Sequence, residues 1–234
     1  TKTGELRITR PIGAILLKMT QNFGALSNET ITAFIERANG NNTTILTDVP
    51  LKAFIAASTA GQSAIFEDGA NLSALLEICE NGSINLQDTE SIKIKLDGLK
   101  SSVTYSLYGI EFPSYSDDVI SISRKNLLAG ETDRLFDVRE QELMIIEGVD
   151  SLLEMNVAFN NGKNCKYIPE EIKAISRDLD AVKLVTVGTT PSVAFDLAGL
   201  ITFPLVEVNS IDIKKKSGEA VTIYLKNDVV TFSN

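Results

Sequence analysis

Paired carboxylates are the side chains of this sequence whose type and spacing are best suited to chemistry. Three such pairs occur, at Asp117 and Asp118, Glu140 and Glu142, and Asp178 and Asp180. Two neighbouring acids can serve as the acid and the nucleophile of a glycosidase, or as oxygen ligands of calcium. No DxDxDG loop accompanies these acids, and adjacent acids in turns or at helix ends are usually solvated charges. We therefore expect neither catalysis nor a metal site at these pairs.

Histidine is absent from the sequence, which removes the residue that most often acts as general acid or base near neutral pH. Ser-His-Asp, Cys-His and HExxH chemistry is therefore excluded. The two cysteines, Cys79 and Cys165, lie outside any CxxC or Cys/His metal pattern, and we expect both to be free buried thiols. No GxGxxG or GxxxxGK[ST] loop follows a predicted strand, so nucleotide binding has no support. We expect a protein that is not an enzyme and that holds no cofactor or metal.

Length and charge narrow the class of protein further. With 234 residues, of which 44% are hydrophobic, the chain can bury a substantial core in one large domain or two small ones. A net charge of -9 argues against a surface that coats nucleic acid, and we expect no specific nucleic-acid recognition. No run reaches the roughly 20 apolar residues that span a bilayer, and the first residues lack the long apolar region of a signal peptide. These features predict a soluble protein.

Short apolar segments rich in β-branched and aromatic residues dominate the sequence, and clusters of Asn, Gly, Asp and Ser separate them. This punctuation is typical of antiparallel strands and hairpins. The predicted strands lie at 13–19, 30–37, 42–49, 91–98, 103–112, 118–123, 152–159, 181–188, 200–208 and 220–227. Helices are predicted over 50–59 and 169–179, which begin at Pro, and over 69–81, where Asn71 is a candidate N-cap. The expected fold class is all-β with a few short helices.

The order of the predicted elements repeats along the chain. Segments 31–54 and 153–175 each contain a strand, an Asn-Gly turn, a second strand and a helix that begins at Pro, and segment 91–107 resembles segment 210–225. The Asn-Gly pairs predict type I′ hairpin turns, in which both central residues have positive φ. The offsets are 122 for Asn39 and Asn161, 121 for Lys52 and Lys173, 119 for Ser91 and Ser210, and 118 for Val103 and Val221. Matches that stay in order while their offset drifts slowly indicate a duplicated unit.

Each half of the chain holds enough short strands for two packed sheets, which favours a β-sandwich of the jelly-roll type. The predicted fold is therefore two tandem jelly-roll β-sandwiches in one chain. The boundary is expected within 112–118, where Pro, Ser and Asp mark an exposed junction. This division gives a first jelly roll over 1–113, with an N-terminal arm over 1–12, and a second jelly roll over 114–234.

This architecture resembles the double jelly-roll major capsid proteins of tailless icosahedral bacteriophages with an internal membrane, of the corticovirus kind and its relatives in Flavobacterium-type hosts. The similarity covers the whole chain in duplicated architecture, size and order of elements. It implies a structural protein of the virion that forms pseudo-hexameric homotrimers, which tile an icosahedral shell. It also implies penton or minor capsid proteins and an internal lipid membrane as partners, a location in the capsid, and assembly in the host cytoplasm.

The resemblance gives a role to the N-terminal segment, which in this family commonly lies on the inner side of the shell. Lys2, Arg7 and Arg10 form a modest basic group there in an otherwise acidic chain. As an arm, this segment would face anionic lipid headgroups or neighbouring capsomers. The alternative is a solvated terminus with a first edge strand.

A run of three lysines, Lys214 to Lys216, precedes Ser217-Gly218 in the second copy of the repeated hairpin. Such a run suits contact with lipid or nucleic acid. Charges at a hairpin tip with Gly are more often a solvated turn, and the first copy has Leu96-Asp97-Gly98 at this place. We therefore expect a solvated turn here.

Two other classes of function remain open at this point. A phage spike, receptor-binding or carbohydrate-binding β-sandwich module would show an exposed Tyr cluster or a calcium site at one loop end, and the five Tyr are scattered along the sequence. An enzyme on a double jelly-roll frame, such as a deglycosylase or a cupin-like protein, is the weaker alternative. Cupin-type metal chemistry uses His ligands, which this sequence does not contain.

Overall fold

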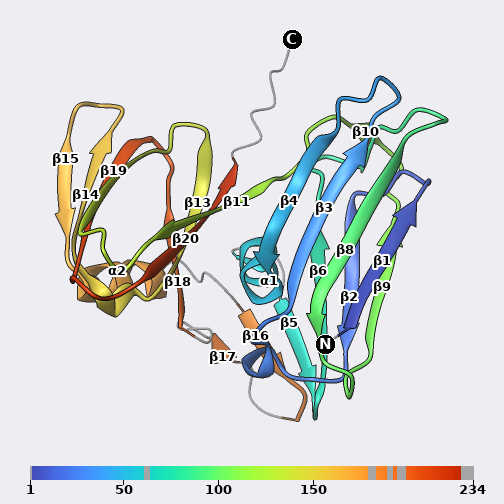
Figure 1. Ribbon diagram of the computed structural model, residues 1–234, viewed down its shortest axis with the longest axis horizontal. Helices are drawn as coiled ribbons and strands as arrows, with labels where there is room; N and C mark the ends of the chain where they lie inside the picture. The colour runs from blue at the N-terminus through green and yellow to red at the C-terminus, as the bar shows by residue number, and fades with distance from the viewer. Residues whose placement is uncertain (1, 61–63, 179–182, 189–191, 194–198, 228–234) are drawn as a thin grey trace. The chain divides into compact units, whose positions relative to one another are not determined.

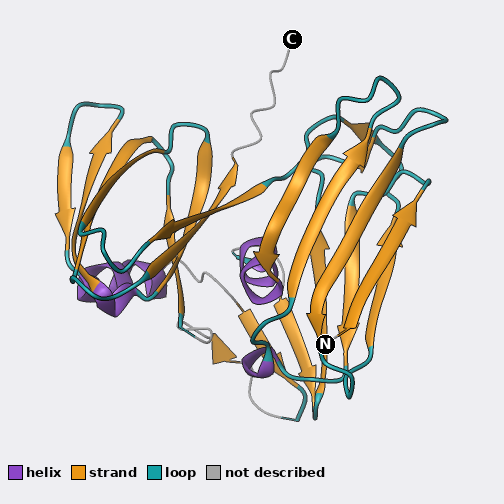
Figure 2. Ribbon diagram, in the orientation of Figure 1, coloured by secondary structure: helices purple, strands orange, loops and turns teal. Residues whose placement is uncertain are grey.

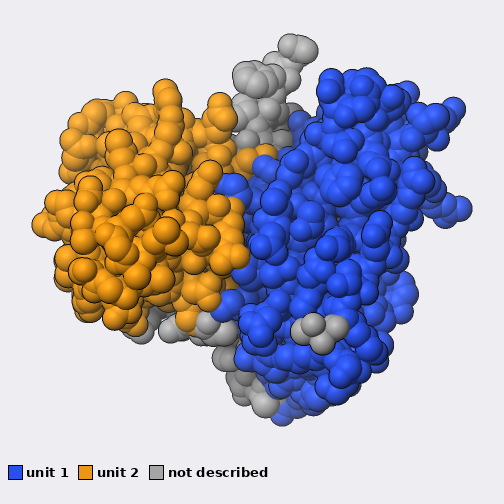
Figure 3. Space-filling model, in the orientation of Figure 1, with its two compact units in different colours: residues 1–123, 182–193, 229–234 blue, residues 124–181, 194–228 orange. Residues whose placement is uncertain are grey.

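The computed structural model describes residues 2–60, 64–178, 183–188, 192–193 and 199–227, and the chain divides into two compact units. Unit 1 contains residues 1–123, 182–193 and 229–234, and unit 2 contains residues 124–181 and 194–228 (Figure 3). Strands dominate both units, and among the described residues each unit has one α-helix (Figure 2). No helix in these ranges is both long and apolar enough to cross a membrane.

Unit 1 is a sandwich of two mainly antiparallel sheets (Figure 1). The first sheet has the order β1 (Lys2–Ile8), β8 (Ser91–Leu99), β3 (Thr30–Glu36), β4 (Thr43–Pro50). The second has the order β17 (Ser192–Val193), β16 (Lys183–Thr186), β5 (Ala64–Asp68), β6 (Asn71–Glu77), β2 (Ala14–Met19), β9 (Tyr105–Ile110). Two short strands, β7 (Ser83–Ile84) and β10 (Tyr115–Ser116), form a separate parallel pair.

The core of unit 1 follows from alternation along its strands, because successive side chains of a strand point to opposite faces. In the first sheet the buried side chains of β8 lie opposite those of β3, namely Ile92, Ile94 and Leu96 opposite Ile35, Ala33 and Ile31. In the second sheet the buried side chains of β2 lie opposite those of β6, namely Ile15, Leu17 and Met19 opposite Leu76, Ala74 and Leu72. These inward-facing sets hold the two sheets together.

Both predicted helices that begin at Pro are confirmed. Helix α1 (Leu51–Thr59) follows Pro50 and packs against β4, β5 and β6, with all of its side chains except Lys52 buried. Helix α2 (Pro169–Asp178) has Pro169 as its first residue, where the missing N–H costs no helical hydrogen bond. The Glu171 side chain accepts a hydrogen bond from the Ile168 N–H at 3.0 Å, which satisfies one of the free donors at the start of this helix.

Unit 2 is also a sandwich of two sheets. One has the order β12 (Asp133–Asp137), β19 (Val208–Lys215), β14 (Leu152–Phe159), β15 (Asn164–Tyr167). The other has the order β11 (Ile122–Leu127, of which residues 124–127 belong to unit 2), β20 (Val221–Asn227), β13 (Gln141–Glu147), β18 (Leu200–Pro204). Apolar side chains from both sheets and from α2 form its core, including Leu127, Phe136, Met144, Met155, Val157, Ile172, Ile211, Ile223 and Leu225.

The two units repeat one strand order, which confirms the predicted duplication. The order β1-β8-β3-β4 in unit 1 corresponds to β12-β19-β14-β15 in unit 2, and β6-β2-β9 corresponds to β18-β13-β20. The helix after the second hairpin strand also recurs, as α1 and α2. In unit 2, β11 lies beside β20. In unit 1, no strand among the described residues occupies the equivalent position beside β9.

The hairpin turns at Gly40 and Gly162 differ from the predicted type I′ form. Both glycines have positive φ, but Asn39 and Asn161 do not, as type I′ would require. The N–H of Gly40 donates to the Arg37 carbonyl at 3.0 Å, and the N–H of Gly162 donates to the Phe159 carbonyl at 3.0 Å. These contacts define type I turns that end at a left-handed Gly, and the Asn side chain accepts a local N–H instead.

The helix predicted over 69–81 is wrong. The segment forms β6, in which the apolar side chains with period two, Leu72, Ala74 and Leu76, are buried against β2. Leucines at 72, 75 and 76 fit a helical face equally well, and pairing with a distant strand decides between the two forms.

The predicted boundary at 113/114 differs from the observed division in two ways. Residues 114–123 stay with unit 1, because β10 pairs with β7 and Val119 forms a β-bridge with Cys79. Residues 182–193 also join unit 1, because β16 pairs in parallel with β5 from Lys183 opposite Ala64 to Thr186 opposite Glu67. The predicted halves therefore describe the repeat but not the full content of each unit.

Candidate functional site

Two of the carboxylates singled out in the sequence take part in local contacts within their units. Asp118 accepts a hydrogen bond from the Ser116 hydroxyl at 2.8 Å, and Glu142 forms an ion pair with the buried Lys226. Asp178 ends α2, and Asp180 lies outside the described residues. Over the ranges that the structure describes, no group of three or more His, Cys, Asp or Glu is placed to hold a metal ion.

Both cysteines are free thiols, as predicted, and Cys165 is only partly buried. Burial raises the pKa of the Cys79 thiol to about 11, and the nearby carboxylates of Asp118, Asp117 and Glu80 act in the same direction. Cys79 is therefore protonated near neutral pH, and a protonated thiol is a poor nucleophile.

The N-terminal basic residues are placed on and after an edge strand, not on a free arm. Residues 2–8 form β1, which pairs with β8 from Lys2 opposite Leu99 to Ile8 opposite Ile92. Lys2, Arg7 and Arg10 are all exposed. At about 3.3 Å per residue, the strand separates its two ends by about 20 Å, so Lys2 and Arg10 are far apart. The predicted arm over 1–12 is therefore wrong for residues 2–8, which form the edge strand that the alternative interpretation expects.

Arg7 is engaged within unit 1, unlike the other two basic residues. Its Nε donates to the Ser91 hydroxyl at 3.0 Å, and its guanidinium lies 3.6 Å from the Glu36 carboxylate. The Lys93 ammonium binds Glu36 at 2.6 Å and, with Ser91, lowers the pKa of this carboxyl. Lys2 and Arg10 have no ion-pair partner among the residues described, so their charges face solvent.

The lysine run is not the solvated turn that the sequence predicts. Lys214 and Lys215 end β19, and Lys214 forms an ion pair with Glu154 at 2.7 Å. The side chain of Lys215 is 1% exposed, because strand alternation turns it inward with Ile211 and Ile213. There its ammonium donates to the carbonyl oxygens of Glu219 at 2.6 Å, Lys216 at 3.3 Å and Ala129 at 3.4 Å. The run therefore anchors loops of unit 2 rather than presenting a charged tip.

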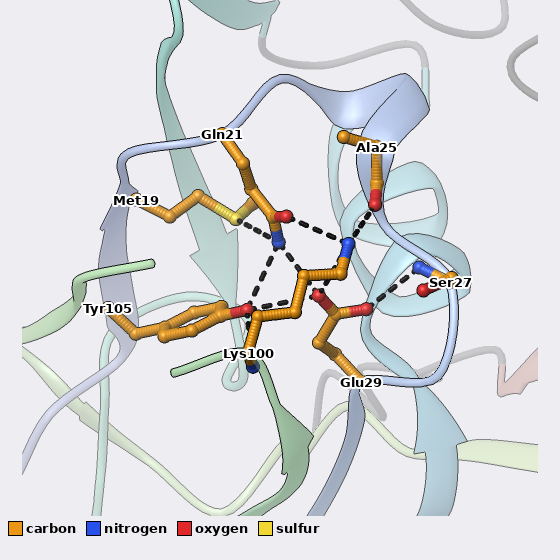
Figure 4. A network of polar contacts seen from close by, with 7 residues as sticks. All are labelled: Met19, Gln21, Ala25, Ser27, Glu29, Lys100 and Tyr105. Atoms are coloured by element: carbon orange, nitrogen blue, oxygen red, sulfur yellow. Dashed lines mark hydrogen bonds and ion pairs between the residues drawn. The ribbon is translucent and has the colours of Figure 1, made fainter. Parts of the chain in front are cut away.

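A buried carboxylate, Glu29, is the centre of the densest polar network around a single acid in unit 1 (Figure 4). Its Oε1 accepts hydrogen bonds from Gln21 Nε2 at 2.9 Å and from the Tyr105 hydroxyl at 3.0 Å. Its Oε2 accepts from the Ser27 N–H at 2.7 Å, and the Lys100 ammonium lies 3.3 Å from Oε1. Burial alone would raise the pKa of Glu29, but these donors outweigh it and lower the pKa to about 2.

This network joins three segments that are distant in sequence. Lys100, in the turn after β8, also donates to Gln21 Oε1 at 3.1 Å and to the Ala25 carbonyl. The Tyr105 hydroxyl, from β9, also accepts from Gln21 Nε2 at 3.2 Å. The loop over 20–28 is thereby tied to the turn over 100–104 and to β9. The arrangement is that of a structural clamp, because every polar group of the network points at another member of the network.

The sequence contains one weak sign of this network. Glu29 stands immediately before a predicted strand, which is the one local signal that this acid differs from the surface acids. Its partners Lys100 and Tyr105 lie more than seventy residues away. The pairing of β8 with β3 brings Lys100 close, and the pairing of β9 with β2 brings Tyr105 close to Gln21.

The tyrosines divide into internal and exposed groups. Tyr105 belongs to the Glu29 network, Tyr167 stacks edge-on against Phe203 with ring centroids 5.6 Å apart, and Tyr224 donates to Glu147 at 2.8 Å. Tyr108 and Tyr115 are 52% and 60% exposed. Three of the five tyrosines therefore serve packing in one unit or the other.

Comparison with known proteins identifies a shared fold. No family model matches the sequence, and no curated protein matches it. Among solved structures, the major capsid protein P2 from Bacteriophage PM2 matches with a TM-score of 0.53 at 11% identity, over 99% of this chain and 94% of that chain. Quercetin 2,3-dioxygenase from Acinetobacter baumannii matches with a TM-score of only 0.25 at 8% identity, over 97% of this chain and 67% of that chain, and supports no argument. The protein therefore has the double jelly-roll fold of a bacteriophage major capsid protein.

Proposed function

We propose that this protein is a structural protein of a virion, a major capsid protein whose copies build the shell. The observation that carries the proposal is the repeated strand order of the two units together with a match to a major capsid protein along nearly the whole chain. Buried polar contacts stiffen each unit, as the Glu29 network does in unit 1 and Lys215 does in unit 2. Stiff units are what a shell subunit needs.

The proposed mechanism is geometric. Homo-oligomers with closed symmetry are the common outcome of self-association, and a trimer of single sandwiches would have a threefold outline. Two similar sandwiches in each chain give a trimer a pseudo-hexagonal outline, which fills sixfold positions of an icosahedral lattice with one polypeptide. The duplication would then be the feature that lets one chain tile a facet.

The native mass of the purified protein, combined with negative-stain imaging, tests this proposal. We expect particles of about three times the 25.4 kDa of one chain, with a six-lobed outline, and larger plates or shells at high concentration. A chain that stays monomeric over the whole concentration range would contradict the proposal. Binding of the monomer to a glycan would instead favour a receptor-binding module.

We also propose that Lys2 and Arg10 face the interior of the shell and meet anionic lipid headgroups there, with Arg7 holding β1 in place. Their exposure and lack of an ion-pair partner among described residues support this role. Co-sedimentation with vesicles that contain anionic lipid tests it. Lys2→Glu with Arg10→Glu should reduce binding, whereas Lys163→Glu, at an exposed turn of unit 2, should not. Penton or minor capsid proteins as partners, and assembly in the host cytoplasm, belong to the same proposal.

A further inference from the structure

Strand β9 leaves one edge of unit 1 open. Its counterpart in unit 2, β20, has a strand on each side, β13 and β11. Among the strands that the structure describes, β9 has only β2 beside it and is the last strand of its sheet. A strand edge of this kind presents a row of backbone N–H and C=O groups that can pair with another extended segment.

An apolar cleft runs along this open edge, between β9 of one sheet and β1 of the other. It has a volume of about 250 Å³ and is lined by Leu6, Leu96, Leu99, Tyr105 and Leu107, among others. Leu6 is 40% exposed, although it lies on the inward face of β1 opposite the buried Ile94. The core of unit 1 is therefore open to solvent on this side.

The same place is closed in unit 2. The 118-residue offset of the repeat puts Tyr105 and Leu107 at the positions of Ile223 and Leu225, which are 0% and 4% exposed. Tyr105 and Leu107 themselves are only partly buried. In unit 2 the strand beside β20, β11, contributes Leu127, which is 1% exposed and belongs to the core cluster. The closed edge of unit 2 and the open edge of unit 1 therefore differ by one strand that carries an apolar side chain.

We propose that β9 and its cleft bind an extended segment from a second copy of this chain, and that the segment is residues 228–234, DVVTFSN. These seven residues follow β20 and lie outside the described residues, and β9 has six residues to pair with. The segment is rich in β-branched and aromatic residues, which favour strands. Val230 and Phe232 are two positions apart, so in a strand both would face the cleft, while the backbone extends the sheet beyond β9.

This inference rests on the proposed function for its use, because it names a contact between copies of a shell subunit. The affinity of the cleft for the segment is nevertheless measurable on single chains. A chain that binds the segment but never forms a shell would contradict the proposed function and leave this inference standing.

Binding of a labelled peptide tests the site directly. A chain that ends at Asn227 is titrated into a fluorescent peptide of residues 226–234, and fluorescence anisotropy should show saturable binding. Leu107→Asp should weaken binding about tenfold or more, since it removes an apolar contact worth more than 1.4 kcal/mol. Tyr108→Ser, which changes the exposed neighbour on the opposite face of β9, should leave the affinity unchanged. If Leu107→Asp does not fold, Leu107→Ala should still weaken binding severalfold.

Backbone pairing is tested with two methylated peptides. Alternate residues of a strand direct their N–H groups to the same side. Methylation of the amides at Val229 and Thr231, or at Val230 and Phe232, should therefore abolish binding in one peptide and not in the other. Equal binding of both peptides, equal binding by Leu107→Asp, or no binding at all would overturn the proposal.

The source of the segment is tested by cross-linking between two variants. In a background with Cys79→Ala and Cys165→Ala, Leu6→Cys and Phe232→Cys are made in separate chains and mixed under mild oxidation. Exchange between copies predicts a disulfide-linked product that contains one chain of each kind. A cross-link that forms only when both cysteines are in the same chain would mean that each chain fills its own cleft, which would overturn exchange between copies.

Discussion

Gly40 and Gly162 adopt the same backbone conformation at equivalent places of the two units. Both have a φ of 80°, and each donates its N–H to the carbonyl oxygen three residues earlier at 3.0 Å. The side-chain oxygen of the Asn before each glycine accepts a hydrogen bond from the N–H of the residue that follows the glycine. The distance is 2.9 Å in unit 1 and 3.0 Å in unit 2. Agreement at this level of detail makes the duplication a property of the structure and not only of the sequence.

Replacing either turn glycine should cost a similar, modest amount of stability. A side chain at positive φ is strained, so Gly40→Ala and Gly162→Ala should each lower the free energy of unfolding by about 1 kcal/mol. No atom lies within 4 Å of the added Cβ at either site, so no clash adds to this cost. Gly130→Ala is the matched control, because Gly130 has equal space but no positive φ. Urea unfolding measures the difference, and equal values for all three variants would contradict the strain.

Gly98 should be far less tolerant than Gly40. It lies within β8 with a φ of 70°, and a Cβ there would come within 2.2 Å of the Asn28 carbonyl oxygen. Gly98→Ala must therefore move backbone, and we expect a loss of about 3 kcal/mol or a failure to fold. Gly40→Ala is the control for the effect of positive φ alone. Comparable melting temperatures for the two variants would show that the contact with Asn28 carries no cost.

The Glu29 network should matter more to stability than a partly exposed ion pair. Glu29→Gln keeps the shape of the side chain but leaves donors from Ser27, Tyr105 and Lys100 without a charged acceptor. We expect a loss of about 2 kcal/mol, the range for an unsatisfied buried polar group. Glu36→Gln, at the partly exposed pair with Lys93, should cost less, because ion pairs near the surface contribute little to stability. Chemical unfolding of both variants measures the two losses in the free energy of unfolding. A larger loss for Glu36→Gln than for Glu29→Gln would show that the network does not stabilise the fold.

The contribution of Glu29 to the free energy of unfolding should be lost over a defined range of acidic pH. The pKa of Glu29 is lowered from 4.5 to about 2 in the folded protein, so its stabilising effect is present above pH 4.5 and is lost as the pH falls toward 2. The pKa values of Asp137 and Glu154 are also lowered to about 2, by hydrogen bonds from Arg139 and from Lys166 and Lys214. Thermal unfolding between pH 5 and pH 2 should show a steeper loss for the unmodified protein than for Glu29→Gln. Parallel curves would assign the acid sensitivity to other carboxyl groups.

Lys215 should behave as a core residue despite its charge. Lys215→Ala leaves the carbonyl oxygens of Ala129, Lys216 and Glu219 without this donor and opens space in unit 2. We expect a loss of about 2 kcal/mol, with the loop over 216–220 becoming more protease-sensitive. Lys163→Ala, at an exposed turn, should leave stability unchanged within about 0.5 kcal/mol. Limited proteolysis and unfolding together test this, and equal behaviour of the two variants would contradict it.

The sequence predicted most of the fold because apolar alternation and Pro act locally. Helices α1 and α2 were predicted where Pro50 and Pro169 set their starts, and the repeated hairpins carried the duplication. β6 was missed because its leucines fit both a helix and a strand, and hydrogen bonding to β2 settles the choice. β1 was predicted as an arm because "KTGELRI" has little apolar alternation, and its pairing with β8 joins residues about ninety positions apart.

The polar sites were much less predictable. Charge patterns suggested surface roles for Lys214 to Lys216 and for the N-terminal basic residues, but Lys215 is buried and Arg7 is tied to Ser91 and Glu36. Whether a charged side chain is solvated depends on which way its strand faces and on which carbonyls lie nearby, and both are set by tertiary pairing. Composition therefore indicated where charges occur but not what they bind.

Because β16 pairs in parallel with β5, the first half of the chain cannot complete its fold without the second half. Lys183–Thr186 come from the second half of the chain, yet they complete the sheet of unit 1 beside Ala64–Glu67. A fragment that stops at residue 123 would expose β5 as a bare edge, which invites aggregation. The two repeats therefore have to be encoded in one gene. A gene split between them would encode a first half that lacks part of its own sheet.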